Sequence, residues 1–144
     1  MGEILTDIIF VRHAQSVYGD DDRNRPLTAE GLLDRQIVIH VLKNRKIDAF
    51  LCSPYKRSID TIKPAADFFK MDGFPEILGR YKGKTVVIGT HGTALSTILQ
   101  HYNRDFCLND FLRIVNWMPY IIEMKFDGEQ LTEMRELAYV DKTR

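Results

Sequence analysis

The sequence predicts a single α/β domain over residues 1–144, with three layers: a mostly parallel sheet, helices on both of its faces, and a C-terminal antiparallel hairpin. Three short apolar runs are each followed by a polar turn and then by apolar residues at helical spacing. Such strand–helix units build parallel sheets covered on both sides. The hairpin is indicated by two apolar runs that flank Asp127-Gly128, because Asp-Gly accommodates the positive φ angles of a tight turn.

The first two units occupy the N-terminal half of the chain. Residues 4–11 (ILTDIIFV) form the first expected strand, and a polar loop over 16–27 follows it. Thr28 is the expected N-cap of one helix that passes Gly31 and continues to Lys43. Residues 47–52 are the second expected strand, and 57–69 the helix after it.

The remaining elements close the sheet. Residues 85–89 (TVVIG) read as a buried strand, and 93–101 as the helix that follows. The hairpin strands are expected at 120–126 and 130–137. Charges such as Glu123 and Lys125 would keep an exposed edge strand from pairing with another chain.

Composition excludes several classes of protein. Lys plus Arg and Asp plus Glu both number 20, so there is no overall basic field to collect nucleic acid. No stretch reaches the roughly 18 apolar residues of a membrane span, and the N-terminal run is too short for a signal peptide. Cys52 and Cys107 form neither a disulfide framework nor a metal motif. We therefore expect a cytoplasmic domain with no metal, no membrane and no nucleic-acid partner.

Polar groups follow each of the three parallel strands. Arg12-His13 ends the first strand, Ser53-Pro54 with Arg57 follows the second, and Thr90-His91-Gly92 the third. Because ligands of open α/β sheets bind beyond the carboxyl ends of the strands, these groups should converge. Two arginine forks and helix N-termini at one edge favour an anion such as phosphate.

Each residue alone also has a structural interpretation. A single His at a strand end is more often a hydrogen-bonded structural residue than a catalyst. Arg12 could pair with a surface acid, and Arg57 could be a solvated helix residue. Together, however, two arginines and two histidines at successive strand ends favour function.

Four ordered motifs carry a resemblance to a known family: FVRHAQS at 10–16, RPLTAEG at 25–31, SPYKRSIDT at 53–61 and THGTALS at 90–96. The sequence resembles the histidine phosphatase superfamily, also called phosphoglycerate-mutase-like. The closing MPYIIEMKFDG is similar to the last strands of its broad-specificity phosphatase branch.

The resemblance implies a role for each matching residue. His13 corresponds to the histidine that attacks phosphorus and carries the phosphoryl group covalently. Arg12 and Arg57 correspond to the arginines that hold the equatorial oxygens, and His91 to a second histidine that donates a hydrogen bond to the same group. Ser16 stands where a hydroxyl can still bind phosphate.

Two departures from the family pattern bear on chemistry. Gly19 stands where the family has an Asn, which removes one phosphate contact. The segment at about 70–83 is too short for the family's usual excursion with a catalytic acid, so it is either a natural short form or incomplete, and we favour omission of residues. Asp72 and Glu76 are its only carboxylates and match no pattern of the family.

The resulting expectation is a metal-independent phosphatase that hydrolyses small phosphomonoesters through a phosphohistidine intermediate. A phosphohistidine protein phosphatase is the second possibility, since that branch is similarly short and shares Arg-Pro-Leu-Thr. A catalytically weak phosphate-binding or regulatory domain is the third. A phosphoglycerate mutase is less favoured because mutases are longer. The substrate and the oligomeric state stay open.

Overall fold

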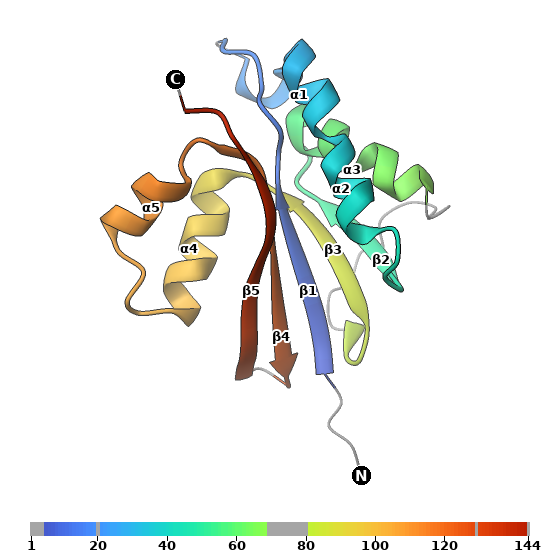
Figure 1. Cartoon of the computed structure of the whole chain (residues 1–144), viewed down its shortest axis with the longest axis vertical. Coiled ribbons are helices and arrows are strands. Elements are labelled where there is room, and N and C mark those ends of the chain that lie inside the picture. The colour runs from blue at the N-terminus through green and yellow to red at the C-terminus, as the bar shows by residue number, and fades with distance from the viewer. Residues whose placement is uncertain (1–4, 20, 69–80, 129, 144) are drawn as a thin grey trace.

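The computed structural model describes residues 5–19, 21–68, 81–128 and 130–143. The predicted fold class is confirmed: one five-stranded sheet, in the order β2-β3-β1-β4-β5, lies between two groups of helices. Figure 1 shows α1, α2 and α3 on one face of the sheet and α4 and α5 on the other.

The strands follow the sequence pattern closely. They are β1 (Leu5–Arg12), β2 (Ala49–Cys52), β3 (Thr85–Thr90), β4 (Trp117–Asp127) and β5 (Gln130–Asp141). β1 and β2 each pair parallel with β3, whereas β4 pairs antiparallel with β1 and with β5. The hairpin turn has Gly128 at φ 60°, the left-handed region that glycine adopts without steric cost. Both hairpin strands are longer than predicted.

The helices are α1 (Ala29–Asp34), α2 (Gln36–Leu42), α3 (Lys56–Phe68), α4 (Gly92–Tyr102) and α5 (Leu108–Ile114), with a short 3₁₀ helix, η1 (Asp22–Asn24). Thr28 is the N-cap of α1, as predicted: its hydroxyl accepts a hydrogen bond from the Gly31 N–H at 3.0 Å. α5 and η1 were not predicted, because elements of seven and three residues carry almost no periodicity.

One predicted helix is two helices in the structure. The segment after Thr28 is interrupted at Arg35, where ψ is −17°. There the Arg35 side chain donates a 2.8 Å hydrogen bond to the carbonyl oxygen of Asp60 in α3. The interruption thus lies where the segment contacts its neighbouring helix, which the apolar pattern alone does not show.

Two hydrophobic clusters fill the space on the two faces of the sheet. On one face, Ile9 and Val11 of β1 pack with residues of α2 and α3, such as Val38 and Ile62. On the other face, Phe10 packs in a cluster that includes residues of α4 and α5. Successive side chains of β1 point to opposite faces of the sheet and so contribute to both hydrophobic clusters, as expected for a central strand.

The expected role of Glu123 at a sheet edge is wrong. Glu123 lies on β4, which β5 covers, and is only 1% exposed. Its carboxylate pairs with Arg45 and Arg135, so it is a buried charge with partners rather than an edge charge. Lys125 is partly exposed and lies 4.0 Å from Glu133 of β5.

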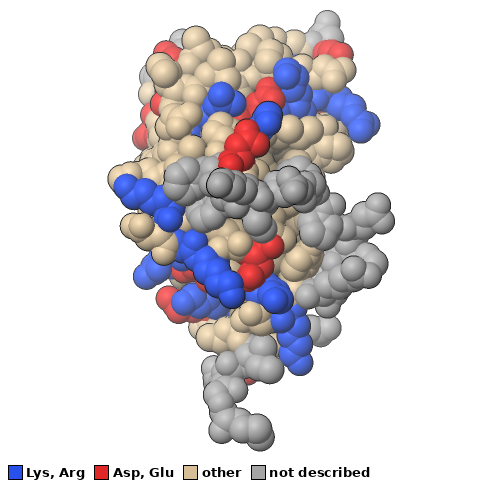
Figure 2. Space-filling model, turned by 90° about the vertical axis from the view of Figure 1, so that its right-hand side faces the viewer, with Lys and Arg blue, Asp and Glu red and all other residues tan. Residues whose placement is uncertain are grey.

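The surface carries mixed charge. On the face shown in Figure 2, Asp and Glu lie among more numerous Lys and Arg side chains. Among the described residues, no helix has both the length and the apolar character needed to span a membrane. The short segment at about 70–83 lies mostly outside the described residues, and so do Asp72 and Glu76.

Candidate active site

A cavity of about 870 Å³ opens at the carboxyl ends of β1 and β3. All five residues predicted for the site line it: Arg12, His13, Ser16, Arg57 and His91. The charged side chains among its described lining residues are all basic; besides Arg12 and Arg57 they are Arg25 and Lys142. An anion is the ligand that this lining favours.

Arg12 is fixed by the backbone of a distant part of the chain. It is the last residue of β1, paired with Thr90 on one side and Tyr120 on the other. Its Nη1 donates to the carbonyl oxygens of Ile114, Val115 and Trp117, at 3.1, 2.7 and 3.3 Å. Burial lowers the pKa of the guanidinium to about 10, so Arg12 still carries its charge at neutral pH.

His13 is buried, with 6% of its surface exposed, and its ring has a defined tautomer. Its backbone N–H donates to the carbonyl of Thr90 at 3.0 Å, which joins the end of β1 to the end of β3. Nδ1 lies 2.6 Å from the carbonyl oxygen of Ala14; since a carbonyl only accepts, Nδ1 carries the proton and Nε2 keeps the lone pair.

The charge state of His13 follows from the same surroundings. Burial, with Arg12, Arg57 and His91 nearby, lowers the pKa of the imidazole to about 4, against the opposing effect of the Ala14 carbonyl. His13 is therefore neutral at physiological pH. A neutral imidazole with a free Nε2 lone pair is a nucleophile.

Arg57 lies in the first turn of α3 and is 5% exposed, so it is not a solvated helix residue. Its Nη1 donates to the carbonyl of Asp22 at 2.6 Å, and its guanidinium lies 4.8 Å from the ring centroid of Tyr55. Thr61, one turn later, accepts from the Ala14 N–H and donates to the Arg57 carbonyl, which ties α3 to the residue after His13.

His91 is the N-cap residue of α4, directly after β3. Its ring lies 5.3 Å, centroid to centroid, from the ring of Tyr55. Burial and the nearby Arg57 lower its pKa, although Asp22 acts in the opposite direction. Two histidines and two arginines from three strand ends thus surround one cavity.

The loop after His13 folds back on itself and forms one wall of the cavity. Ser16 and Leu27 form an antiparallel bridge, and the Val17 N–H donates to the Pro26 carbonyl at 2.9 Å. Gly31 lies so close to this loop that a Cβ there would be 2.2 Å from the Gln15 carbonyl oxygen. This pairing brings Ser16 and Arg25 to the cavity.

Several lining residues were not assigned a role from the sequence. Arg25 stands in the Arg-Pro-Leu-Thr motif, which was the available signal. Lys142, from the end of the chain, donates to Glu30 and contacts Asp34, and no local pattern marks it. The remaining unassigned lining residues include Tyr18, Phe111, Asn116 and Met118. In the part of the chain that is described, no three His, Cys, Asp or Glu side chains are grouped to hold a metal ion.

Comparison with known proteins adds to this geometry. The sequence model of the histidine phosphatase superfamily (branch 1) matches residues 8–72, which include three of the four motifs. The family resemblance is confirmed. His91 lies beyond the matched residues, so its position at the site comes from the structure alone. No curated protein sequence matches the chain significantly.

Solved structures extend the likeness to nearly the whole chain. A structure assigned as the phosphohistidine phosphatase SixA from Agrobacterium tumefaciens is 15% identical, with a TM-score of 0.69; the match covers 94% of this chain and 97% of that one. The protein histidine phosphatase SixA complexed with tungstate is also 15% identical, with a TM-score of 0.68 and coverage of 90% and 96%.

A third structure, phosphoserine phosphatase from Entamoeba histolytica in complex with phosphoserine, is 14% identical, with a TM-score of 0.63 and coverage of 93% and 96%. At such low sequence identity, these three structures show only that the fold is similar. The chemistry of the chain depends on its own residues.

Proposed function

We propose that this chain is a metal-independent phosphatase that hydrolyses phosphomonoesters through a phosphohistidine intermediate on His13. The observation that carries the proposal is the state of His13. Its ring is neutral, its proton lies on Nδ1, and it lines a cavity whose charged lining residues, among those described, are all basic. Both the family match and the fold support this reaction class.

The proposed reaction has two displacements at phosphorus. Nε2 of His13 forms a P–N bond while the ester P–O bond breaks, and the alcohol leaves with the electron pair and takes a proton from solvent. Water then forms a new P–O bond and releases a proton to solvent, while the P–N bond breaks and its electron pair returns to Nε2. Arg12, Arg57 and His91 stabilise the charge on the transferring phosphoryl group, and Ser16 adds a hydroxyl donor.

The decisive test is substitution of the nucleophile. His13→Ala should lower turnover of an aryl phosphate by several orders of magnitude, because it removes the attacking Nε2 atom. His91→Ala should lose less, about 10²- to 10³-fold, since it removes one stabilising donor. A denaturing quench at alkaline pH with labelled substrate should trap a base-stable, acid-labile adduct in the wild type and none in His13→Ala.

The outcomes separate the possibilities. Full activity of His13→Ala would disprove the assigned nucleophile. Phosphate binding without turnover or adduct in the wild type would make the domain a binding module. Because charge compensation is assigned to arginines, a chelator should leave the rate unchanged, and a loss that Mg²⁺ or Zn²⁺ restores would contradict metal independence.

A phosphohistidine protein phosphatase is the second candidate. Val17 and Tyr18 of the cavity wall are 42% and 94% exposed, as suits contact with a protein that presents the phosphoryl group. The likeness to two SixA structures supports this candidate as well. Comparison of kcat/KM for a phosphohistidine-carrying protein and for the aryl phosphate decides between the two, and a large preference for the former would favour the second.

A further inference from the structure

The loop wall of the cavity holds a third arginine that the proposed reaction does not use. Arg25 lines the cavity, and its side chain is 21% exposed. It precedes Pro26, which restricts it to extended backbone, and it has φ −63° and ψ 121°. The pairing of Val17 with Pro26 then fixes this stretch beside the strand end that carries His13.

Gly19 lies beside the Arg25 side chain. A Cβ on Gly19 would lie 4.0 Å from both Cγ and Cδ of Arg25. A Cβ at position 19 would therefore make only an ordinary van der Waals contact with Arg25. Gly19 has no side chain to bind phosphate, but the Arg25 side chain runs beside it.

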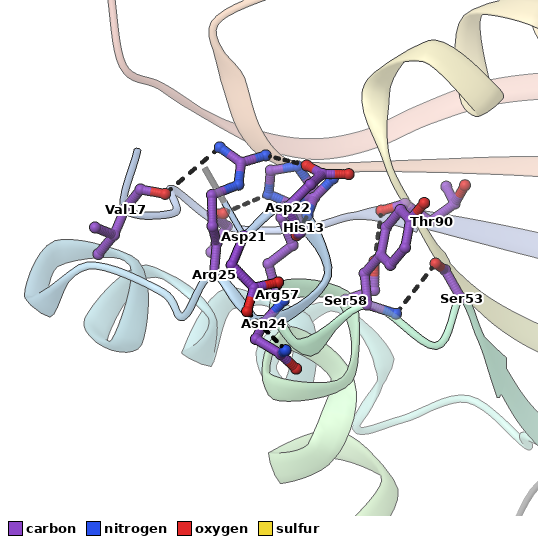
Figure 3. A network of polar contacts seen from close by, with 12 residues as sticks. His13, Val17, Asp21, Asp22, Asn24, Arg25, Ser53, Arg57, Ser58 and Thr90 are labelled. Carbon is purple, nitrogen blue, oxygen red and sulfur yellow. Dashed lines mark hydrogen bonds and ion pairs between the residues drawn. The ribbon is translucent and has the colours of Figure 1, made fainter. Parts of the chain in front are cut away.

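One carboxylate oxygen bridges Arg25 and Arg57. Asp22 Oδ1 lies 2.7 Å from Nη2 of Arg25 and 3.3 Å from Nη2 of Arg57. Figure 3 shows these three side chains gathered beside His13. Two guanidinium groups are thus already spaced to share a single anionic oxygen, and a phosphoryl oxygen can accept from the same pair.

Arg25 and Arg57 also have N–H donors without a hydrogen-bond partner among the described residues. The Nε atoms of Arg25 and Arg57 are buried, and neither has a hydrogen-bond partner among the described residues; the same is true of Arg12. Arg35, outside the cavity, shares this feature, so the free Nε by itself does not mark the site. Arg12, Arg25 and Arg57, however, combine an unpartnered Nε with a place in the cavity lining.

Asp22 can leave this position at little cost. Its side chain is 58% exposed, in contrast to the 6% of Arg57, so water can solvate the carboxylate once it moves. The hydrogen bond from Arg25, with Arg57 close by, holds the pKa of Asp22 below its usual range, and the carboxylate is therefore ionised at neutral pH. A doubly charged phosphoryl group offers more negative charge and more acceptor oxygens to the same donors.

We infer that Arg25 is a third phosphate-binding arginine, and that Asp22 is a counter-ion which occupies the Arg25–Arg57 pair until a phosphoryl group displaces it. This inference rests on the proposed function and adds a binding residue and a competing carboxylate to that site. It predicts that removing the charge of Arg25 weakens phosphate binding, whereas removing the charge of its ion-pair partner Asp22 strengthens it.

Binding of inorganic phosphate and of vanadate, measured by calorimetry, tests the inference in the full chain. Arg25→Gln should weaken binding about 10-fold or more, because it removes a charged, forked donor. Arg25→Lys should recover only part of the loss, since an ammonium cannot bind two oxygens in the same way. Asp22→Asn should strengthen binding several-fold, because it removes the competing charge.

Two neighbouring variants are matched controls. Arg23→Gln and Asp21→Asn change the same charges one or two positions away, at exposed residues that do not line the cavity. Asn at position 21 keeps a side-chain oxygen to cap η1. Both variants should bind phosphate as the wild type does, and thermal unfolding should verify that all five variants are folded.

The outcomes are distinguishable from failure of the proposed function. A wild type that binds phosphate and turns over aryl phosphate, together with an Arg25→Gln variant of equal affinity, would overturn the role of Arg25 alone. Unchanged or weaker binding in Asp22→Asn would overturn displacement of Asp22. A wild type that neither binds phosphate nor reacts would remove the proposed function, and this inference with it.

Discussion

Arg12 shows how a single side chain is oriented from several directions. Three carbonyls hold Nη1, and the opposite side of the guanidinium lies against Gly92. A Cβ on Gly92 would lie 2.9 Å from Nη2 and 3.0 Å from both Cζ and Nε of Arg12. The guanidinium cannot move away freely, because the carbonyls fix it.

Gly92→Ala should therefore disturb the phosphate contact more than the fold. The added methyl group pushes the guanidinium by a few tenths of an ångström, and small misplacements in preorganised sites have large kinetic effects. We expect kcat/KM to fall about 10-fold or more, with a thermal stability close to that of the wild type because Ala favours the helix. Wild-type kcat/KM in a correctly folded Gly92→Ala would contradict this account of Arg12.

At the scale of elements, the junction of α1 with the loop after His13 leaves no room for a side chain at Gly31. Gly31 in α1 faces the Gln15 carbonyl oxygen, and the Thr28 N–H donates to the same oxygen at 2.9 Å. The close approach, rather than a positive φ angle, is what requires glycine here.

Gly31→Ala should displace the loop or the start of α1. A methyl group cannot lie 2.2 Å from a backbone oxygen, so backbone must shift. We expect a loss of about 1–3 kcal/mol in the free energy of unfolding and at least a 10-fold loss of activity, because the loop carries Ser16 and Arg25. Denaturant unfolding and aryl phosphate kinetics measure both.

Leu33→Ala is the control for that variant, since Leu33 lies in the same helix and is 75% exposed. It should behave as the wild type in both measurements. Equal stability of Gly31→Ala and Leu33→Ala would show that the contact at Gln15 is not restrictive.

At the scale of the whole molecule, a buried charge cluster joins four segments of the chain. Glu123 on β4 pairs with Arg45, which follows α2, and with Arg135 on β5, and it contacts Asp7 on β1. Burial and the neighbouring Glu123 raise the pKa of Asp7 to about 6, whereas Glu123 stays ionised. The proton of this carboxyl pair therefore lies on Asp7.

This cluster predicts a pH dependence of stability. The pKa of Asp7 is higher in the folded protein than the ordinary value of 3.8, so its contribution is fully present below about pH 4 and is lost as the pH rises through about 6. Asp7→Asn should remove that loss. Relative to the wild type, it should gain on the order of 1–3 kcal/mol between pH 4 and pH 8.

Denaturant unfolding of both proteins at the two pH values measures the difference. His13 contributes the opposite slope, because its lowered pKa favours the folded state above about pH 6.5, but this contribution is common to both proteins and cancels. Asp67→Asn, at an exposed acid of α3, should show no such gain. A pH-independent difference between Asp7→Asn and the wild type would refute the raised pKa.

The sequence by itself determined the alternation of strands and helices, the cap at Thr28 and the Asp-Gly turn, because these depend on residues within a few positions of one another. It also determined which strand ends carry Arg12, His13, Arg57 and His91. Parallel strands then bring their carboxyl ends to one edge, so these side chains could be expected to share a site before any contact was known.

Only the tertiary structure decided how those side chains are held. Arg12 depends on carbonyls more than 100 positions away, and Lys142 reaches the cavity from the end of the chain. The same holds for the interruption at Arg35, the burial of Glu123 and the bridge that Asp22 makes between Arg25 and Arg57. Each depends on which segments pack together in space, and a local sequence pattern contains no information about such distant neighbours.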